Sequence, residues 1–371
     1  MKGTVRKEGS SWSYLVCIGK DPLTNKYKYK RKRGFKTKKE CEVALAQLIT
    51  ELDKGTVIDN DKMIISDYLD YWLETYVLTN CSPNTYKRYK LSVNDIKNYL
   101  GPIKLSKLNP LMIEKFYKNV LEDKEISSNT LLKTHRTFHL ALKHAQQWQL
   151  LHYNPCDLVT KPKEIKKEIE FWNPDQVKNY LNKLNGHVLY NITYIACHTG
   201  MRVGELCGLR WENVDLKNGV IYVVDQLQRI DGKLTLTKLK TTNAKRAITL
   251  YPSTVELLRK LQNTTKVINL NDYKKEENNN FVFCWDDGRP MDPHYVSQNF
   301  REALEYCGIN DIITFHGTRH THATMLLKAG TNIKVISKRL GHSNVAFTMD
   351  TYVHVNLEMQ KEEIYKASQF L

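Results

Sequence analysis

The stretch FHGTRHTHAT, residues 315–324, holds three histidines and one arginine. The spacing of His316 and His320 resembles that of a metal-binding helix, because H-x-x-x-H places two imidazoles on one helical face. In a zinc hydrolase a glutamate follows the first histidine, and here that position is Gly317. The stretch therefore argues against a metal site, and its histidines and arginine need another explanation.

Three further segments of the C-terminal half also concentrate reactive side chains. They are HTGMRVGEL (198–206), TKLKTTNAKR (237–246) and LGHSNVAFTMDTYVHV (340–355). Each has an ordinary explanation when it is taken alone: an arginine at a helix start, one lysine among many, and one tyrosine among 21. The chemistry that they indicate becomes specific only when the four segments are considered together.

In this order and at these separations, the four segments resemble the tyrosine recombinase family, specifically the integrases of temperate phages and integrative elements. The motifs that carry the resemblance are T-G-x-R-x-x-E-L, H-x-x-R-H-x-x-A-T, L-G-H and D-T-Y-x-H. The resemblance covers essentially the whole chain. It implies a basic N-terminal arm-binding module, a helical core-binding domain and a catalytic domain.

The resemblance also implies a set of site residues. The hairpin tip between Lys240 and Arg246 is longer than expected for the family, so Lys238 stays open as an alternative to Lys240. Glu205 matches the acidic position that, in the family, supports the catalytic residues without contacting the DNA itself. The implied catalytic residues are Arg202, Lys240, His316, Arg319, His342 and Tyr352, with Tyr352 as the nucleophile.

These residue types suit a reaction that breaks a phosphodiester and conserves the energy of that bond in a covalent intermediate. A tyrosine hydroxyl can form such an intermediate, because it makes an ester with the phosphate. Planar guanidinium groups at Arg202 and Arg319 can hold the non-bridging oxygens of the transition state. An ammonium at Lys240 can protonate the leaving 5′ oxygen, which contributes roughly 10²- to 10⁴-fold. His316 can then accept or orient the tyrosine proton and His342 can hydrogen-bond the phosphate, so we expect no metal or other cofactor.

The 3′-phosphotyrosyl bond conserves the phosphodiester energy, so a partner strand's 5′ hydroxyl can reseal the DNA without ATP. We therefore predict a site-specific DNA recombinase that integrates and excises a mobile element or prophage. Exchange between two duplexes requires four active protomers, and we expect a homotetramer on synapsed DNA. Three alternatives stay open: a type IB topoisomerase-like enzyme, a chromosome-dimer-resolving recombinase, and a catalytically idle DNA-binding regulator.

The composition agrees with a DNA partner. The chain has 371 residues, and its 56 Lys and Arg against 40 Asp and Glu give a net charge of +16, which argues for a polyanionic ligand. A hydrophobic content of 41% excludes a mainly disordered chain. No long apolar run or signal peptide is visible, and eight scattered cysteines without a C-x-x-C pair indicate reduced thiols. We expect a protein of the bacterial cytoplasm that acts on DNA and does not enter a membrane.

Charge and periodicity divide the chain into predicted domains. Residues 1–39 carry thirteen Lys and Arg against two acidic residues, which indicates a basic module that binds nucleic acid. The resemblance implies that this module reads arm-type attachment sites, while the other domains bind core-type sites. A directionality factor and a DNA-bending host protein are expected partners. The predicted boundaries are an arm-type DNA-binding domain over 1–54, a linker over 55–65, a helical core-binding domain over 66–160, a linker over 161–172 and the catalytic domain over 173–371.

In the N-terminal module, the alternation over 12–18 and 27–35 predicts a basic hairpin with a turn over 20–26. Thr37 and Glu40 form the signature of a capping box, and the helix that follows should bury Val43, Ala44, Leu48 and Leu52. The predicted DNA contacts lie on this hairpin and on the second domain: Lys28, Lys30, Arg31, Arg33, Lys87 and Arg88.

Elsewhere, Ser82-Pro83, Asn109-Pro110 and Ser127 are helix-start signals, and four helices predict an all-helical second domain. Runs over 219–225, 233–239 and 246–250 predict a three-stranded antiparallel sheet inside a mainly helical catalytic domain. Residues 271–280 are predicted to form a loop. The tail over 356–371 could dock on its own domain or on a neighbouring protomer. The fold class is multidomain α+β: a small basic sheet with a helix, an all-helical domain, and this catalytic domain.

Overall fold

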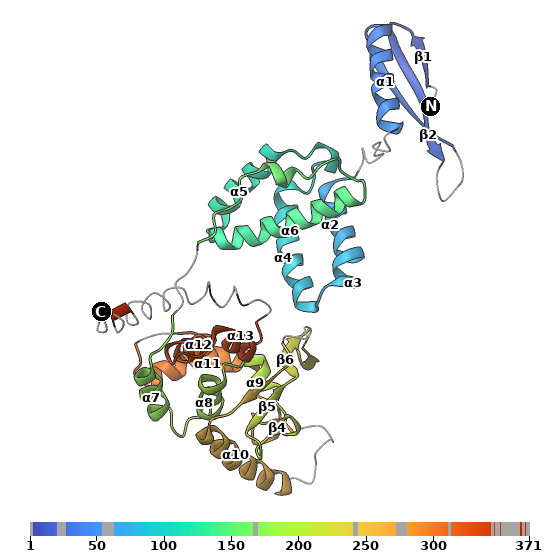
Figure 1. Ribbon diagram of the computed structural model, residues 1–371. Coiled ribbons are helices and arrows are strands. Elements are labelled where there is room, and N and C mark those ends of the chain that lie inside the picture. Colours follow the sequence, from blue (N-terminus) through green and yellow to red (C-terminus); the bar gives the residue numbers. More distant parts are fainter. Residues whose placement is uncertain are drawn as a thin grey trace. The chain divides into compact units, whose positions relative to one another are not determined.

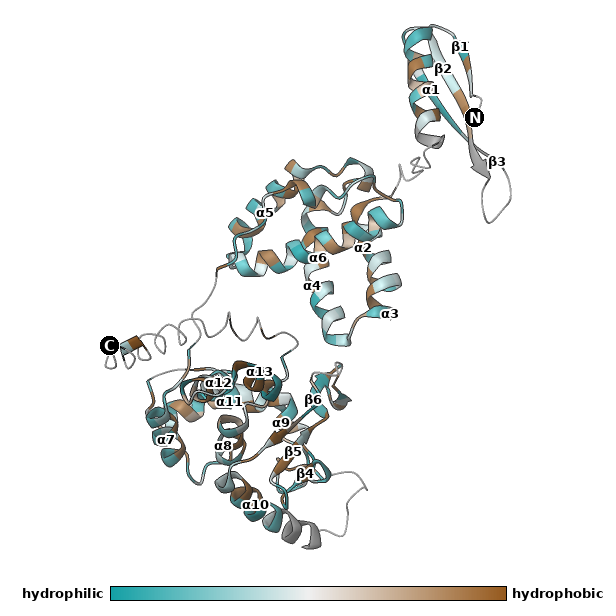
Figure 2. Ribbon diagram, in the orientation of Figure 1, coloured by the Kyte–Doolittle hydropathy of each residue, from teal (hydrophilic) through white to brown (hydrophobic). Residues whose placement is uncertain are grey.

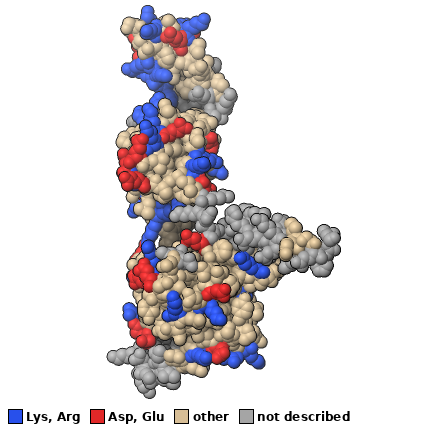
Figure 3. Space-filling model, turned by 90° about the vertical axis from the view of Figure 1, so that its left-hand side faces the viewer, with Lys and Arg blue, Asp and Glu red and all other residues tan. Residues whose placement is uncertain are grey.

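The computed structural model describes residues 3–20, 27–53, 63–165, 170–239, 244–271, 280–310, 313–342, 345, 349, 364, 365 and 368. The chain divides into two compact units, Met1–Lys166 and Lys167–Leu371 (Figure 1). On the face shown in Figure 3, basic and acidic side chains are interspersed over both units, so the net positive charge is not collected there in one patch. No helix in the described part of the chain is long and apolar enough to cross a bilayer.

The chain begins with an antiparallel sheet of β1 (Gly3–Glu8), β2 (Ser11–Lys20) and β3 (Tyr27–Phe35), in that order, followed by α1 (Lys38–Asp53). The predicted hairpin is therefore confirmed as part of a three-stranded sheet. Its turn at residues 21–26 lies outside the described residues. Side chains of β2 that point to one face, Tyr14 and Val16, pack against α1.

The capping box of α1 is confirmed. The Glu40 backbone N–H donates to Thr37 Oγ1 at 3.2 Å, and the Thr37 N–H donates to Glu40 Oε2 at 3.3 Å. The predicted buried face is wrong at Val43, which is exposed, while Cys41, Leu45 and Leu48 face the sheet. Helical periodicity alone allowed either of two adjacent faces of α1 to be buried. The face that carries Leu45 is the one that packs against the sheet. The side chain of Leu52 lies outside the described part.

The second group of elements is helical, as predicted. Its N-caps are confirmed, since the side chains of Ser82, Asn109 and Ser127 accept backbone N–H bonds from the first turn of their helices. Apolar and polar positions alternate along these helices in Figure 2, as in amphipathic helices around a common core. The elements are α2 (Ile65–Trp72), a π-helical turn (Leu73–Val77), α3 (Leu78–Asn80), α4 (Pro83–Leu100), α5 (Pro110–Lys124) and α6 (Ser128–Gln147).

The second unit is mainly helical with small antiparallel sheets. A capping box of Asn173 and Gln176 starts its first helix. The helices are α7 (Pro174–Lys183), α8 (Tyr190–Thr199), α9 (Val203–Cys207), α10 (Pro252–Asn271), α11 (Pro293–Tyr306), α12 (Gly317–Lys328) and α13 (Ile333–Leu340). The strands are β4 (Val214–Asp215), β5 (Val220–Val223), β6 (Asp225–Ile230), β7 (Lys233–Lys238) and β8 (Arg246–Thr249).

The three-stranded sheet of this unit is present, but its strands differ from the predicted ones. Its order is β4-β5-β8, while β7 pairs with β6 in a separate two-stranded hairpin. The reason is the dipeptide Asp231-Gly232, whose φ angles of 47° and 80° are both positive. Such a two-residue turn joins adjacent strands directly. Most of the predicted loop over 271–280 and of the tail over 356–371 lies outside the described residues.

Candidate active site

The T-G-x-R motif forms the connection from α8 to α9. Gly200 ends α8 with a φ of 67°, and a Cβ there would lie 2.7 Å from Leu340 Cδ2 and 2.8 Å from the His322 ring. Glycine is therefore required for its backbone conformation and for close packing against α12 and α13. Two residues later, Arg202 occupies the position just before the first turn of α9.

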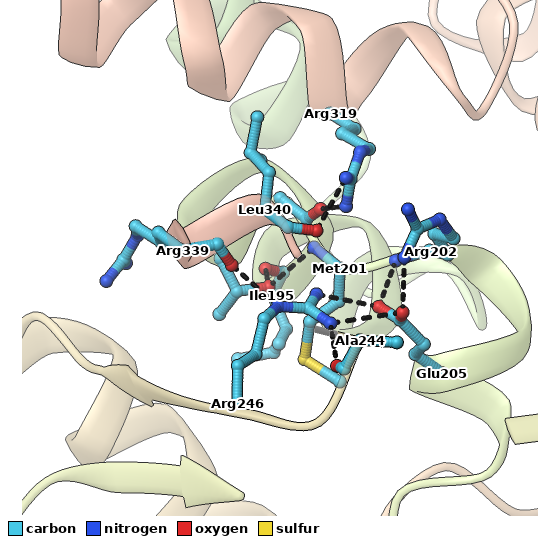
Figure 4. A network of polar contacts seen from close by, with 11 residues as sticks. Ile195, Met201, Arg202, Glu205, Ala244, Arg246, Arg319, Arg339 and Leu340 are labelled. Atoms are coloured by element: carbon cyan, nitrogen blue, oxygen red, sulfur yellow. Dashed lines mark hydrogen bonds and ion pairs between the residues drawn. The ribbon is translucent and has the colours of Figure 1, made fainter. Parts of the chain in front are cut away.

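Glu205 lies fully buried in the first turn of α9 and holds Arg202 in two ways. The Arg202 backbone N–H donates to Glu205 Oε2 at 2.9 Å, and Arg202 Nη1 donates to Oε1 at 2.7 Å (Figure 4). Burial alone would raise the pKa of Glu205, but the hydrogen bonds and charge of Arg246, with the charge of Arg202, lower this pKa to about 2. The carboxylate is therefore ionised at neutral pH.

Arg246 is a functional candidate that the sequence interpretation missed. Its Nη1 and Nη2 donate to Glu205 Oε1 and Oε2 at 3.1 and 2.8 Å, and its Nε donates to the Arg339 carbonyl oxygen at 2.6 Å. One signal was available: in the strand pattern, Arg246 falls on the same face as Ile248, a core position. An arginine on an inward face requires a buried carboxylate partner.

Arg319, on the first turns of α12, is also almost completely buried. Its Nη1 donates to the Gly200 carbonyl oxygen at 2.7 Å, and its Nη2 donates to the Leu340 carbonyl oxygen at 2.6 Å (Figure 4). These bonds fix the guanidinium between the segment that leads to Arg202 and the segment that leads to His342. The Arg319 guanidinium is thus bonded to the backbone two residues before Arg202, the arginine of the other motif.

The charges of the same two arginines act on His316 and His342. Partial burial, then the charges of Arg319 and Arg202, lower the pKa of His316. Burial, then the same two charges, lower the pKa of His342 to about 4. Both imidazoles are therefore neutral at neutral pH, and each can accept a hydrogen bond. The structure brings together five of the predicted site residues: Arg202, Glu205, His316, Arg319 and His342.

The other histidines of the 315–324 stretch have different surroundings. His322 is buried, its Nδ1 lies 3.0 Å from the Cys197 carbonyl oxygen, and its Nε2 accepts a bond from Arg339 Nε at 3.0 Å. Burial and the charge of Arg339 lower the pKa of His322 to about 3. His320 stacks edge-on against His316, with ring centroids 5.0 Å apart. Within the described ranges, no three His, Cys, Asp or Glu side chains are grouped so that they could bind a metal ion.

Lys238 has a defined partner on the β6–β7 hairpin. Its Nζ lies 3.0 Å from Oδ1 of Asp225, a buried carboxylate that also accepts a bond from Arg210 Nη2 at 2.9 Å. Asp225 and Lys238 are directly opposite each other at the base of the hairpin. Lys240 and Tyr352 lie outside the described residues, so their predicted roles stay predictions.

An open cavity of about 450 Å³ lies beside this cluster. It is bounded by the start of α9, by β6 and by the first turn of α11. Arg202 and His316 belong to its lining, as do Gln226, Gln228, Arg229 and Asp292. The cluster is therefore reachable from outside the unit on the side where Arg202 and His316 lie.

The predicted DNA contacts of the N-terminal sheet fall on both of its faces. Arg31 pairs across the sheet with Leu15, on the face away from α1, and Arg31 and Arg33 both form ion pairs with Glu8. Lys30 pairs with Val16, whose side chain packs under α1, so Lys30 belongs to the helix side. Lys28 lies in β3, and its side chain is not among those described. On α4, Lys87 and Arg88 are exposed.

Three family models match the chain. A model described as the Phage integrase family matches residues 170–359, an Arm DNA-binding domain matches 4–52, and a Phage integrase N-terminal SAM-like domain matches 64–121. Among curated proteins, the chain is 29% identical over 365 residues to a "Tyrosine recombinase XerC-like" of Caldanaerobacter subterraneus subsp. tengcongensis, covering 92% of this chain and 91% of that protein. It is 24% identical over 372 residues to the ICEBs1 integrase of Bacillus subtilis strain 168, covering 98% of each.

A likeness of fold extends to solved structures. The Tn1549 transposon integrase (residues 82–397, Y379F), solved in complex with transposon right end DNA, superposes with a TM-score of 0.69. The two chains are 22% identical, and the match covers 82% of this chain and 100% of that one. The fold of the matched part of this chain is therefore shared with a protein solved on DNA.

Proposed function

The chain belongs to the phage integrase family, and on that premise we propose how its residues carry out site-specific DNA recombination. The family match and the relatives named recombinase and integrase identify an enzyme that cleaves and rejoins DNA strands. The observation that carries the assignment of the site is the pair of anchored guanidiniums, Arg202 on Glu205 and Arg319 on two backbone carbonyls. This pair can hold the two non-bridging oxygens of one phosphate.

Tyr352 is the proposed nucleophile. Its hydroxyl oxygen attacks the scissile phosphorus, a 3′-phosphotyrosyl bond forms, and the bond from phosphorus to the 5′ oxygen breaks. Negative charge increases on the non-bridging oxygens in the transition state, where Arg202 and Arg319 stabilise it without further rearrangement because both are already fixed. Reversal of the same step by a 5′ hydroxyl of another strand rejoins the DNA.

Two proton transfers accompany cleavage. The tyrosine loses a proton, and His316 can accept or orient that proton because its imidazole is neutral at neutral pH. The 5′ oxygen gains a proton, for which we propose Lys240. Lys238 is the weaker candidate, because its ammonium already pairs with the buried carboxylate of Asp225. His342, also neutral, can donate a hydrogen bond to the phosphate.

The proposed partners are double-stranded DNA and other copies of this chain. We assign arm-type sites to residues 1–54 and core-type sites to residues 66–160 and 173–371, joined by linkers over 55–65 and 161–172. Four protomers act on two synapsed duplexes, assisted by a directionality factor and a DNA-bending protein. The match of an arm DNA-binding model favours this function over a topoisomerase-like one, because relaxation of a single duplex requires no second recognition module.

A covalent adduct on trapped DNA tests the proposed nucleophile. The protein is incubated with nicked core-site DNA from which the cleaved end diffuses away, and the products are separated on a denaturing gel. Wild type should accumulate an adduct and Tyr352→Phe should form none. An adduct in the Phe variant would remove Tyr352 from this role, and its absence in wild type on authentic sites would favour an idle DNA-binding regulator.

The choice between the two lysines has its own test. A 5′-bridging phosphorothiolate replaces the leaving oxygen by sulfur, which departs as a thiolate and needs no proton. Cleavage by Lys240→Ala should therefore be restored on this substrate, and cleavage by Lys238→Ala should show no such selective gain. Rescue of Lys238→Ala but not of Lys240→Ala would reverse the assignment.

A further inference from the structure

Arg246 is a buried cation that the chemistry proposed above does not use. Its side chain is only 3% exposed, although it stands at the first residue of the short strand β8. The guanidinium donates to acceptors on three different segments of the unit: Glu205 on α9, the Arg339 carbonyl oxygen on α13, and the Ala244 carbonyl oxygen two residues before it. Figure 4 shows it at the centre of this network.

Arg246 is poorly suited to bind phosphate itself. A guanidinium has five N–H donors, and the Nε, Nη1 and Nη2 atoms of Arg246 make four hydrogen bonds to protein acceptors between 2.6 and 3.1 Å. Arg202 differs, because one of its bonds goes to Glu205 and its side chain is partly exposed. Four of its five donors are thus used on protein groups, and through these groups Arg246 can influence DNA cleavage.

The group that it holds most directly is the carboxylate of Glu205. Arg246 contacts both oxygens of that carboxylate, while the side chain of Arg202 contacts Oε1. Without Arg246, Arg202 would be the remaining cationic partner of a buried anion, and it would be drawn inward to neutralise it. With Arg246 present, the charge of Glu205 is already balanced, and Arg202 can direct its other N–H groups outward.

The second group that Arg246 holds is the end of α13. Its Nε bond to the Arg339 carbonyl lies next to the Arg319 bond to the Leu340 carbonyl, and His342 follows two residues later. We propose that Arg246 is a positioning residue for strand cleavage, which sets the direction of the Arg202 guanidinium through Glu205 and fixes the end of α13 before His342. The inference rests on the proposed role of Arg202 as a phosphate ligand.

A substrate change separates this role from a purely structural one. A methylphosphonate at the scissile position replaces one charged non-bridging oxygen by a methyl group, so less negative charge develops there in the transition state. The tyrosine still displaces the 5′ hydroxyl. A variant that misdirects Arg202 should therefore be less impaired on methylphosphonate than on phosphodiester, whereas a loosely folded variant should be impaired equally on both.

The experiment uses the full-length chain and nicked core-site DNA that carries either linkage. We expect Arg246→Lys, which keeps the charge but cannot make four bonds, to cleave phosphodiester DNA roughly 10²-fold more slowly, the loss typical of a misplacement of about 1 Å. DNA affinity should be unchanged, and the loss should shrink about tenfold on methylphosphonate, since one good charge-assisted contact contributes at least that factor. A matched control is Leu258→Ala, which cuts a cavity in α10 at a buried residue outside the network.

The outcomes distinguish the inference from its premise. Arg202→Ala is the reference, and its loss must shrink on methylphosphonate; if it does not, both the role of Arg202 and the inference fail. If Arg202→Ala shows this recovery but Arg246→Lys loses the same factor on both linkages, as Leu258→Ala does, only the inference is overturned. If Arg246→Lys does not fold, Glu205→Gln decides: recovery on methylphosphonate supports the inference, and an equal loss on both linkages overturns it.

Discussion

Two places in this chain build the same grouping of one glutamate with two arginines. On the N-terminal sheet, Glu8 pairs with Arg31 and Arg33, and in the catalytic unit Glu205 pairs with Arg202 and Arg246. The glutamate side chain is 28% exposed in the first group and 0% exposed in the second. The side-chain types are the same, and burial is the main difference between them.

Burial changes what such a group can do. An exposed ion pair is screened by water and contributes about 0 to 1 kcal/mol, so the arginines of the sheet can leave Glu8 for a phosphate at little cost. Removal of one partner from a buried pair leaves an uncompensated charge and costs about 3 to 5 kcal/mol. The first group is therefore suited to exchange partners, and the second to hold a geometry.

Deletion of residues 1–54 should have the largest effect on recombination, because it removes the Glu8 group and leaves the Glu205 group in place. Cleavage at isolated core sites should survive, because the Glu205 group and its neighbours lie entirely in the second unit. Integrative recombination should fall by about 10²-fold or more, the loss expected when a second binding module no longer raises the effective concentration. Equal recombination by the shortened chain would contradict a separate arm module.

Arg246→Ala should destabilise the catalytic unit by about 3 to 5 kcal/mol, because it leaves Glu205 buried with a single cationic partner. Urea unfolding of the full chain, followed by hydrogen exchange of peptides from residues 203–207 and 246–249, would measure this change. Arg33→Ala is the matched control on the exposed group and should cost less than about 1 kcal/mol. Similar losses at both sites would mean that burial does not distinguish them.

Acid should unfold the catalytic unit before the N-terminal sheet. A lowered histidine pKa means that the folded state disfavours the proton, so this stability is complete above pH 6.5 and is lost as the pH falls toward about 3 for His322 and about 4 for His342. Glu205 adds a second loss below its unfolded pKa, as the pH falls toward about 2. Residues 1–53 contain no histidine. Hydrogen exchange at pH 7 and pH 5 should therefore show loosening of the second unit, while peptides from residues 3–53 keep their protection.

Glu8→Gln should have the smallest effect on stability, less than about 1 kcal/mol. Binding to arm-site DNA should become a few-fold tighter at low salt, because an anion no longer competes with phosphate for Arg31 and Arg33. Fluorescence anisotropy over a salt series would measure it. Glu42→Gln, which removes an exposed partner of Lys38 on α1, is the control. Weaker binding by Glu8→Gln would show that the carboxylate orients the two arginines for phosphate instead of competing with phosphate for them.

Local signals in the sequence predicted much of this architecture. Ser82 and Asn109 precede prolines and cap helices as expected, because a cap depends only on residues within one turn. The family resemblance carried by the motifs implied that Arg202, His316, Arg319 and His342 lie close together. The hairpin of β6 and β7 was also signalled by Asp231-Gly232, although β7 was assigned to the three-stranded sheet and residues 226–230 were assigned no strand.

The predictions that failed, and the residue that was missed, depend on long-range contacts. The exposed position of Val43 follows from where the sheet meets α1, which helical periodicity cannot specify. Arg246 is separated from Glu205 by 41 residues and from Arg339 by 93, so its partners emerge only when β8, α9 and α13 meet. The backbone carbonyls that hold Arg319 have no sequence signature, since every residue has a carbonyl.

The C-terminal end of α13 has an electrostatic consequence. The aligned peptide dipoles of a helix place a partial negative charge on its last carbonyls, and here those of Arg339 and Leu340 accept bonds from two guanidiniums. Part of the positive charge of Arg246 and Arg319 is thus offset by peptide dipoles. These dipoles carry no net charge, and unlike a carboxylate they are not neutralised by protonation at low pH. The cluster can therefore stay strongly cationic before any nucleic acid arrives.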